Sequence, residues 1–103
     1  MSKRFLWVDD VREPPNENYD WVQSVNGAIA GICVTEEVNA PYEMLDLDHD
    51  SGKYHCSGGD YIKLLDWLEA TGRNYPIRIH SMNPVGVQNM RAIIQHNGWT
   101  EVK

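Results

Sequence analysis

The chain has few of the features that mark secreted, membrane or zinc-binding proteins. It has only two cysteines in 103 residues, Cys33 and Cys56, too few for a disulfide framework or a four-thiolate zinc site, so we expect two free thiols. No apolar run is long enough to cross a bilayer, and the stretch MSKRFLWVDD has no signal-peptide core. These absences predict a cytoplasmic protein with no membrane partner.

Basic residues are also scarce. Nine Lys and Arg stand against 15 Asp and Glu, which gives a net charge of −6. Extended nucleic-acid backbones are bound mainly by clustered Lys and Arg, so this balance argues against them as the main partner. An RNA terminus or a small nucleotide held at a local site stays open. Apolar residues make up 42% of the chain, enough for one core, and we expect a single domain over residues 1–103.

Short apolar runs alternate with helical patterns along the chain. Runs rich in aromatic and β-branched residues predict strands, and apolar residues three and four positions apart predict helices. The expected strands are 4–8, 19–25, 42–48, 75–81 and a short one within 99–103, and the expected helices follow at 26 to about 36, 58–72 and 83–98. In the last helix, Asn83 is the expected N-cap, Pro84 takes the first position and Gly98 ends it.

This alternation predicts a small α/β fold, a trimmed doubly wound parallel sheet with helices on both faces. Only about ten residues with two prolines separate the first two strands, which is near the lower limit for a parallel crossover. We therefore expect a turn of helix or less in that first connection.

Acidic residues follow the strands of this predicted sheet. Asp9 and Asp10 come after the first strand, and the stretch LDLDHDSG places Asp48 at the end of the third. The carboxyl ends of parallel strands meet at one edge, where ligands of such sheets bind. Three carboxylates brought together would repel one another without a cation, and hard oxygen ligands suit Mg²⁺ or Mn²⁺. The alternative is that each aspartate merely caps a turn or a helix.

The fourth strand runs into HSMNPVGVQNM, where a helix is expected to begin. Helix starts present free backbone N–H groups to anions, and Ser81 and Asn83 could add side-chain donors for a phosphate. Gly86 would allow a close approach, and Arg12 could reach the same phosphate from the first strand. Alternatively, Asn83 and Pro84 only start the helix, and Arg12 is a surface arginine.

Two histidines, His49 and His80, follow neighbouring strands beside the acids. They could divide the general base and general acid roles, they could bind a transition metal, or they could be structural. A zinc site at His55 and Cys56 is disfavoured, because no third and fourth ligands have suitable spacing. His96 is expected to interact with the dipole of the last helix.

The constellation resembles the receiver domain of two-component signalling. In those domains an acidic pair follows the first strand, an aspartate ends the third and a hydroxyl residue ends the fourth, and the matching positions here are Asp9, Asp10, Asp48 and Ser81. Receivers also carry a lysine after the fifth strand, followed by a further helix, whereas Lys103 is the last residue here. The two histidines, His49 and His80, are foreign to ordinary receivers.

A closer resemblance is to the cyclic-phosphate processing receiver domains, and it spans nearly the whole chain. It rests on LWVDDVREPP, on LDLDHDSG followed by GGDYIKLLDWL, and on IRIHSMNPVGVQNM. The resemblance implies a receiver-like or flavodoxin-like fold. The family name implies a role in handling cyclic phosphate ends, such as those left on broken RNA.

Three functions fit these residues. The first is a metal-dependent phosphoesterase acting on cyclic or terminal phosphates of nucleotides or RNA ends. Its residues would be His49, His80 and Asp48 for catalysis, Ser81, Asn83, Gly86 and Arg12 for phosphate binding, and Asp9, Asp10 and Asp48 for Mg²⁺ or Mn²⁺. The second is a non-catalytic phosphate-binding, nucleotide-binding or protein-interaction module. The third is a phospho-acceptor at Asp48, which is disfavoured because the receiver-type context of a lysine after the fifth strand is missing.

Overall fold

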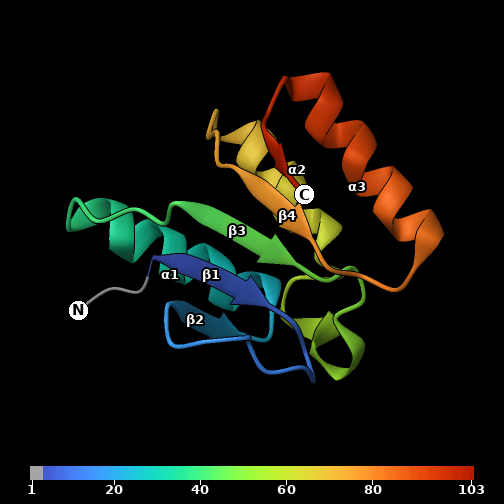
Figure 1. Ribbon diagram of the computed structural model, residues 1–103, viewed down its shortest axis with the longest axis horizontal. Helices are drawn as coiled ribbons and strands as arrows, with labels where there is room; N and C mark the ends of the chain where they lie inside the picture. The colour runs from blue at the N-terminus through green and yellow to red at the C-terminus, as the bar shows by residue number, and fades with distance from the viewer. Residues whose placement is uncertain (1–3) are drawn as a thin grey trace.

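The computed structural model describes residues 4–103, apart from the side chain of Tyr54, and contains one five-stranded parallel sheet (Figure 1). Its strands are β1 (Phe5–Val8), β2 (Tyr19–Val22), β3 (Met44–Leu47), β4 (Ile77–Ile79) and β5 (Glu101–Val102), in the spatial order β2-β1-β3-β4-β5. The helices are α1 (Val25–Glu37), α2 (Ile62–Ala70), α3 (Pro84–Asn97) and the 3₁₀ helix η1 (Gly52–Ser57). The predicted small α/β fold with an all-parallel sheet is confirmed.

The helix ends follow local chemistry. The Asn83 side chain accepts a hydrogen bond from the Gly86 N–H, and Gly98 ends α3 with a φ of 69°, as predicted. Helix α2 starts at Ile62, later than the expected residue 58, because Gly58 and Gly59 adopt φ values of 119° and 88° that no helix accommodates. None of the helices in residues 4–103 is long and apolar enough to span a membrane.

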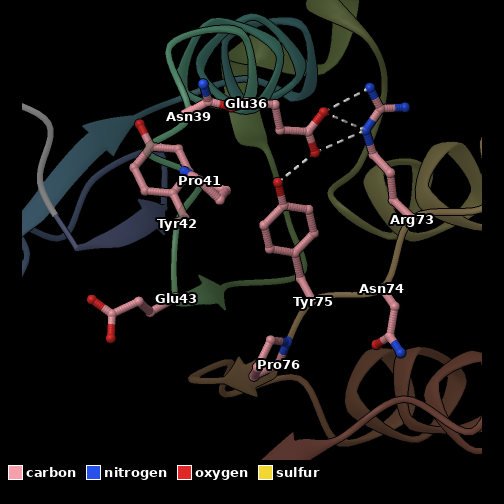
Figure 2. A pocket seen from close by; sticks show the side chains of 9 residues that line it. All are labelled: Glu36, Asn39, Pro41, Tyr42, Glu43, Arg73, Asn74, Tyr75 and Pro76. Carbon is pink, nitrogen blue, oxygen red and sulfur yellow. Dashed lines mark hydrogen bonds and ion pairs between the residues drawn. The ribbon is translucent and has the colours of Figure 1, made fainter.

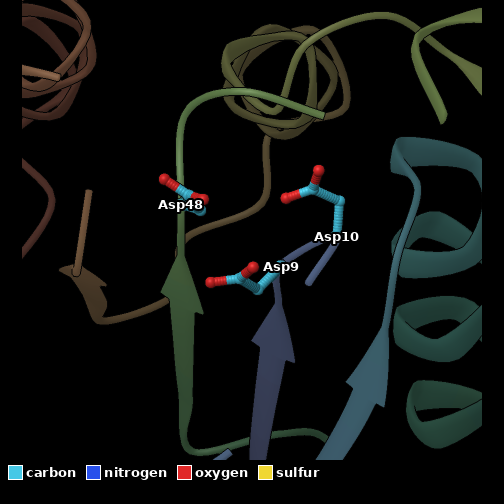
Figure 3. A group of neighbouring side chains, drawn as sticks. All are labelled: Asp9, Asp10 and Asp48. Carbon is cyan, nitrogen blue, oxygen red and sulfur yellow. The ribbon is translucent and has the colours of Figure 1, made fainter. Parts of the chain in front are cut away.

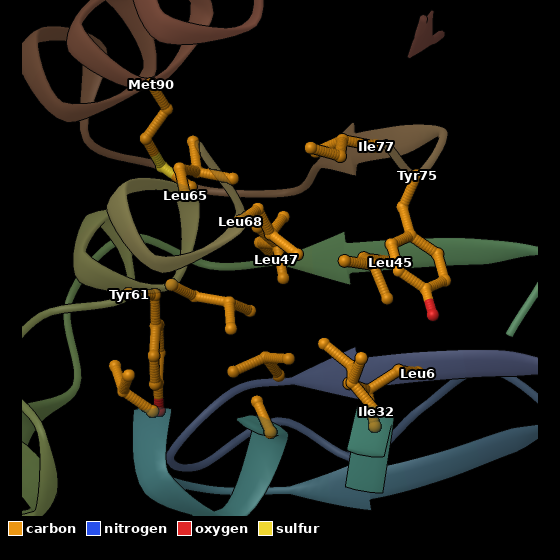
Figure 4. Packing of buried hydrophobic residues seen from close by; sticks show 14 of the residues in the cluster. Leu6, Ile32, Leu45, Leu47, Tyr61, Leu65, Leu68, Tyr75, Ile77 and Met90 are labelled. Carbon is orange, nitrogen blue, oxygen red and sulfur yellow. The ribbon is translucent and has the colours of Figure 1, made fainter. Parts of the chain in front are cut away.

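The three α-helices form a single layer on one face of the sheet, although helices on both faces were expected. Helix α2 contacts both α1 and α3. Residues from all three helices pack with Leu6, Leu45, Leu47 and Ile77 in one hydrophobic cluster (Figure 4). Right-handed crossovers explain the layer, since the connections that carry the helices all step across the sheet in the same direction. Only the β1–β2 connection steps the other way, and it is too short for a helix, as predicted.

The opposite face of the sheet carries aromatic and polar side chains. Trp7 lies beside Trp21 on one side and Asp46 on the other in the strand register. The indole N–H groups of Trp7 and Trp21 donate to the carbonyl oxygens of Arg12 and Asp9, each at 2.8 Å. These two bonds fasten the β1–β2 connection and position the residues that follow β1.

Candidate metal and phosphate site at the carboxyl edge

Three carboxylates meet where β1 and β3 end (Figure 3). Asp9 and Asp10 follow β1, Asp48 follows β3, and one carboxylate oxygen of each lies within 4.8 Å of the others. The N–H of Asp48 donates to the carbonyl of Val8 at 2.9 Å, which extends the pairing of the two strands up to the cluster. The structure thus brings these three residues together, as the shared polarity of parallel strands predicts.

Asp9 is the member of the cluster whose negative charge is stabilised by its neighbours. It is fully buried, and its carboxylate accepts hydrogen bonds from the N–H groups of Arg12 at 2.9 Å and Val11 at 3.0 Å. Its Oδ2 lies 2.9 Å from Nε2 of His80. Burial raises the pKa of Asp9, but the bonds from Arg12, Val11 and His80 together bring it below its usual value. Asp9 is therefore a stable anion without any metal.

Asp10 is in the opposite situation. Its pKa is raised, first by burial and then by the negative charges of Asp9, Asp48 and Asp50, against a smaller lowering by a backbone hydrogen bond. The ion pairs at this edge of the described chain include Asp9 and Asp50, but neither Asp10 nor Asp48. The cluster thus holds more negative charge than its neighbours neutralise.

Gly52 closes the turn beside Asp10 and is a residue that sequence reasoning missed. It has a φ of +55°, and a Cβ built on it would lie 2.3 Å from Oδ2 of Asp10. Any side chain would be strained there and would displace the carboxylate. The Ser-Gly pair that ends LDLDHDSG was the available signal for this left-handed turn.

The donor set fits a hard divalent cation. Asp9, Asp10 and Asp48 offer only oxygen, as Mg²⁺ and Mn²⁺ prefer. The unbalanced charge on Asp10 is what a bound cation would relieve. These three residues would hold the ion.

A pocket of about 420 Å³ adjoins the acids. It is lined by Arg12, Asp48, Asp50, Ser81, Met82, Asn83 and Pro84. The Ser81 hydroxyl accepts a hydrogen bond from the Asn83 N–H at 3.1 Å, which leaves its own proton for a ligand. With the Arg12 guanidinium and the Asn83 amide, it gives the pocket three side-chain donors for an anion. Three of the four predicted phosphate-binding residues therefore share this pocket with Asp48.

Gly86, the fourth predicted phosphate-binding residue, lies elsewhere. It is buried, and its N–H donates to Oδ1 of Asn83 at 3.0 Å in the helix cap. A Cβ at this position would lie 2.4 Å from Cγ of His49. The absence of a side chain at Gly86 therefore makes room for the imidazole of His49.

His49 is held between the acids and the start of α3. Its Nδ1 lies 2.8 Å from Oδ1 of Asp50 and 3.5 Å from Nδ2 of Asn83. Its backbone N–H donates to Oδ1 of Asp48 at 2.7 Å. His49 thus contacts three residues that line the pocket.

His80 is enclosed between two carboxylates. Its side chain is 7% exposed, with Nε2 2.9 Å from Asp9 and Nδ1 2.7 Å from Asp46, and its ring stacks on Trp7 with centroids 3.8 Å apart. Each ring nitrogen thus lies within hydrogen-bond distance of a buried carboxylate. Asp46 is itself fully buried and also pairs with Arg78 at 3.1 Å.

Asp46 was missed as a partner of the site. The period of two in the strand sequence MLDL turns Asp46 away from Leu45 and Leu47, onto the face without helices. That alternation was visible, but the histidine that meets Asp46 comes 34 residues later along the chain.

The sequence profile of the cyclic-phosphate processing receiver domains matches residues 4–96. The chain belongs to this family. Among curated proteins, none matches it in sequence. The family name associates the domain with the processing of cyclic phosphates. The matched residues, 4–96, include every residue of the carboxyl-edge site described above.

A larger cavity lies at the amino edge of this receiver-like domain (Figure 2). It measures about 680 Å³, and its charged groups are matched within the protein. Arg73 donates to both carboxylate oxygens of Glu36, and the Tyr75 hydroxyl donates to the same carboxylate. The bonds from Arg73 and Tyr75 lower the pKa of Glu36, while burial and Glu36 raise the pKa of Tyr75. The carboxylate of Glu36 therefore has no need of a ligand.

Proposed function

We propose that this domain binds a divalent metal ion together with a cyclic or terminal phosphate of a nucleotide or an RNA end, and hydrolyses the phosphate ester. The observation that carries the proposal is that Asp48 belongs to two neighbouring features. Its carboxylate belongs to the acid cluster, and it also lines the pocket that holds the Arg12, Ser81 and Asn83 donors. Carboxylates suited to a cation and hydrogen-bond donors suited to an anion therefore adjoin in one site.

The charges explain why metal and phosphate would bind together. A phosphate placed beside three carboxylates would be repelled unless a cation neutralised them. The metal, held by Asp9, Asp10 and Asp48, would supply positive charge that stabilises the charge developing on the phosphate oxygens. Arg12 and Ser81, which also line the pocket, would orient the phosphate.

His49 is the favoured proton acceptor. The carboxylate of Asp50 beside Nδ1 favours the tautomer in which Nδ1 carries the proton, which leaves Nε2 with a free lone pair for general base catalysis. His80 has both nitrogens engaged by Asp9 and Asp46, so its contacts favour a role in holding Asp9 in position. The two catalytic histidines expected from the sequence are thus reduced to one that is suited to proton transfer.

A binding module without turnover is the second candidate. The enclosure of His80 supports it, because a single histidine remains for both proton transfers of an ester hydrolysis. Either function suits a reducing compartment such as the cytoplasm, since Cys33 and Cys56 are both exposed and unpaired.

The deciding experiment measures binding and hydrolysis of a nucleoside 2′,3′-cyclic phosphate with Mg²⁺ or Mn²⁺. We expect binding that requires the metal and hydrolysis that falls about a hundredfold in His49→Ala, as the loss of a general base usually causes. Glu36→Gln, at the other edge of the sheet, is the matched control and should change neither. Metal-dependent binding without hydrolysis would establish the binding module, and binding that is indifferent to metal would overturn the proposal.

A further inference from the structure

Large apolar side chains are exposed at the rim of the carboxyl-edge pocket. Six such residues are exposed among those that the structure describes: Val11, Trp21, Val34, Val38, Met82 and Val85. Three of them, Val11, Met82 and Val85, lie in the two short segments that supply Arg12, Ser81, Asn83 and Pro84 to the pocket. Half of these exposed apolar residues thus belong to the segments that line one small polar pocket.

Met82 is the central member of this group, which we call the apolar lip (Val11, Met82 and Val85). Its residue surface is 82% exposed, and it lines the pocket itself. Val11 directly precedes Arg12, and Val85 directly follows Pro84, so each valine is adjacent in the chain to a residue that lines the pocket.

The backbone holds the lip in place. The N–H of Val11 donates to Oδ1 of Asp9 at 3.0 Å. The Asn83 cap fixes the turn between Met82 and Val85, through its bonds from the Gly86 N–H and to the Ser81 hydroxyl. The apolar side chains therefore face outward from well-anchored turns.

A polar pocket with an apolar lip is suited to a ligand that is anionic at one end and apolar at the other. The thioether of methionine makes favourable contacts with aromatic rings, which singles out a planar aromatic group rather than a bare sugar. We propose that the lip binds the base of the nucleotide whose phosphate occupies the pocket, with Met82 against the ring. This inference rests on the proposed function and adds to it a subsite for the base of the nucleotide.

The test compares two ligands that differ only in the base. Adenosine 2′,3′-cyclic phosphate and ribose 2′,3′-cyclic phosphate are titrated by calorimetry into the full chain with Mn²⁺. We expect the adenosine compound to bind about tenfold more tightly, a preference of the size that sulfur–aromatic and apolar contacts provide. Met82→Ser should remove most of that preference, and Met82→Leu should keep part of it. Val34→Ser, which changes another exposed apolar residue, on α1, should leave it intact.

The outcomes distinguish failure of the apolar lip proposal from failure of the proposed function. Equal affinities of the wild-type protein for the two ligands would overturn the lip alone, and so would a Met82→Ser variant that loses affinity for both ligands equally. Failure of both ligands to bind in a metal-dependent way would overturn the proposed function, and the lip with it.

A third ligand identifies the source of the nucleotide. A short oligoribonucleotide ending in the same cyclic phosphate should bind at least about fivefold more tightly than the mononucleotide if a second base also stacks on the protein. That gain would assign an RNA end, and affinity equal to that of the mononucleotide would assign the terminal nucleotide alone. A Met82→Ser variant that binds the oligoribonucleotide as tightly as wild type does would overturn the lip.

Discussion

The two edges of the sheet hold charge in opposite ways. At the amino edge, a cavity of about 680 Å³ is lined by Glu36, Arg73 and Tyr75, which satisfy one another. At the carboxyl edge the pocket is smaller, about 420 Å³, yet Asp10 and Asp48 stand beside it without a cation among their described ion pairs. The smaller pocket is the better candidate, because a binding site is marked by groups that the fold leaves unbalanced rather than by volume.

The pKa directions express the same difference. The pKa of Glu36 is lowered, since its partners favour the charged form, whereas the pKa of Asp10 is raised, since burial and neighbouring acids disfavour it. One carboxylate is stabilised as an anion by the fold, and the other is tolerated as an anion at a cost that a ligand can remove.

The largest expected effect belongs to His80. Replacing it by alanine leaves Asp9 and Asp46, both fully buried, without the imidazole that contacts both of them. Breaking a buried pair in this way typically costs about 3–5 kcal/mol of unfolding free energy. Urea denaturation measures the loss. Tyr75→Phe at the amino edge is the matched variant, with an expected cost of about 1 kcal/mol. Equal costs for the two substitutions would show that the Asp9–His80–Asp46 contact is not the stronger one.

Metal addition should have the second-largest effect, and this effect should depend on the carboxyl edge alone. Mg²⁺ or Mn²⁺ at a hundred times its dissociation constant should raise the unfolding free energy by about 2.7 kcal/mol through mass action. Asp48→Asn should abolish most of that gain, because it removes one of the three ligands. Glu36→Gln should retain the gain in full. If the melting temperature does not change at millimolar metal, no cation binds at the carboxyl edge.

Glu36→Gln should itself destabilise the protein by about 1 kcal/mol at neutral pH, since charge-assisted hydrogen bonds from Arg73 and Tyr75 are lost. Because the pKa of Glu36 is lowered from 4.5, its contribution is present above that value and disappears as the pH falls through the folded-state pKa. Thermal unfolding from pH 7 down to pH 3 measures the convergence of the variant and the wild type. Curves that stay parallel throughout would contradict the assignment.

Asp10→Asn should have the smallest effect, and one of opposite sign. Because the pKa of Asp10 is raised above 3.8, the wild type loses stability as the pH rises through that raised value. The variant should therefore be more stable than the metal-free wild type at neutral pH, by less than about 1 kcal/mol, and the gain should vanish in acid. If Asp10→Asn instead lowers the stability at neutral pH, the negative charge of Asp10 is already stabilised by its neighbours in the metal-free protein.

The parallel sheet and the meeting of Asp9, Asp10 and Asp48 could be predicted from the sequence, because parallel strands share polarity and these residues come within two positions of a strand end. The role of Asn83 in starting α3 was equally local. Such features depend on residues within one turn or strand end, and the sequence displays them directly.

Contacts between distant segments could not be predicted in this way. Nothing near His80 in the chain indicates that Asp46 and Trp7 enclose it, and so it was expected to face a ligand. Gly86 was assigned to phosphate for the same reason, since only the fold shows the ring of His49 above it. The layer of helices on one face depends on the direction of each crossover, which follows from strand order rather than from any single segment.

The stacking of Trp7 on His80 has an optical consequence. A histidine ring stacked on an indole quenches its fluorescence, and the two rings are nearly parallel, with an angle of 3° between their planes. Trp7 should therefore be a dim member of the four tryptophans, and its emission should increase when His80 is replaced by glutamine. The difference in emission between the protein and a Trp7→Phe variant isolates this signal. The fold thus contains an intrinsic, label-free probe of the ion pair that holds Asp9.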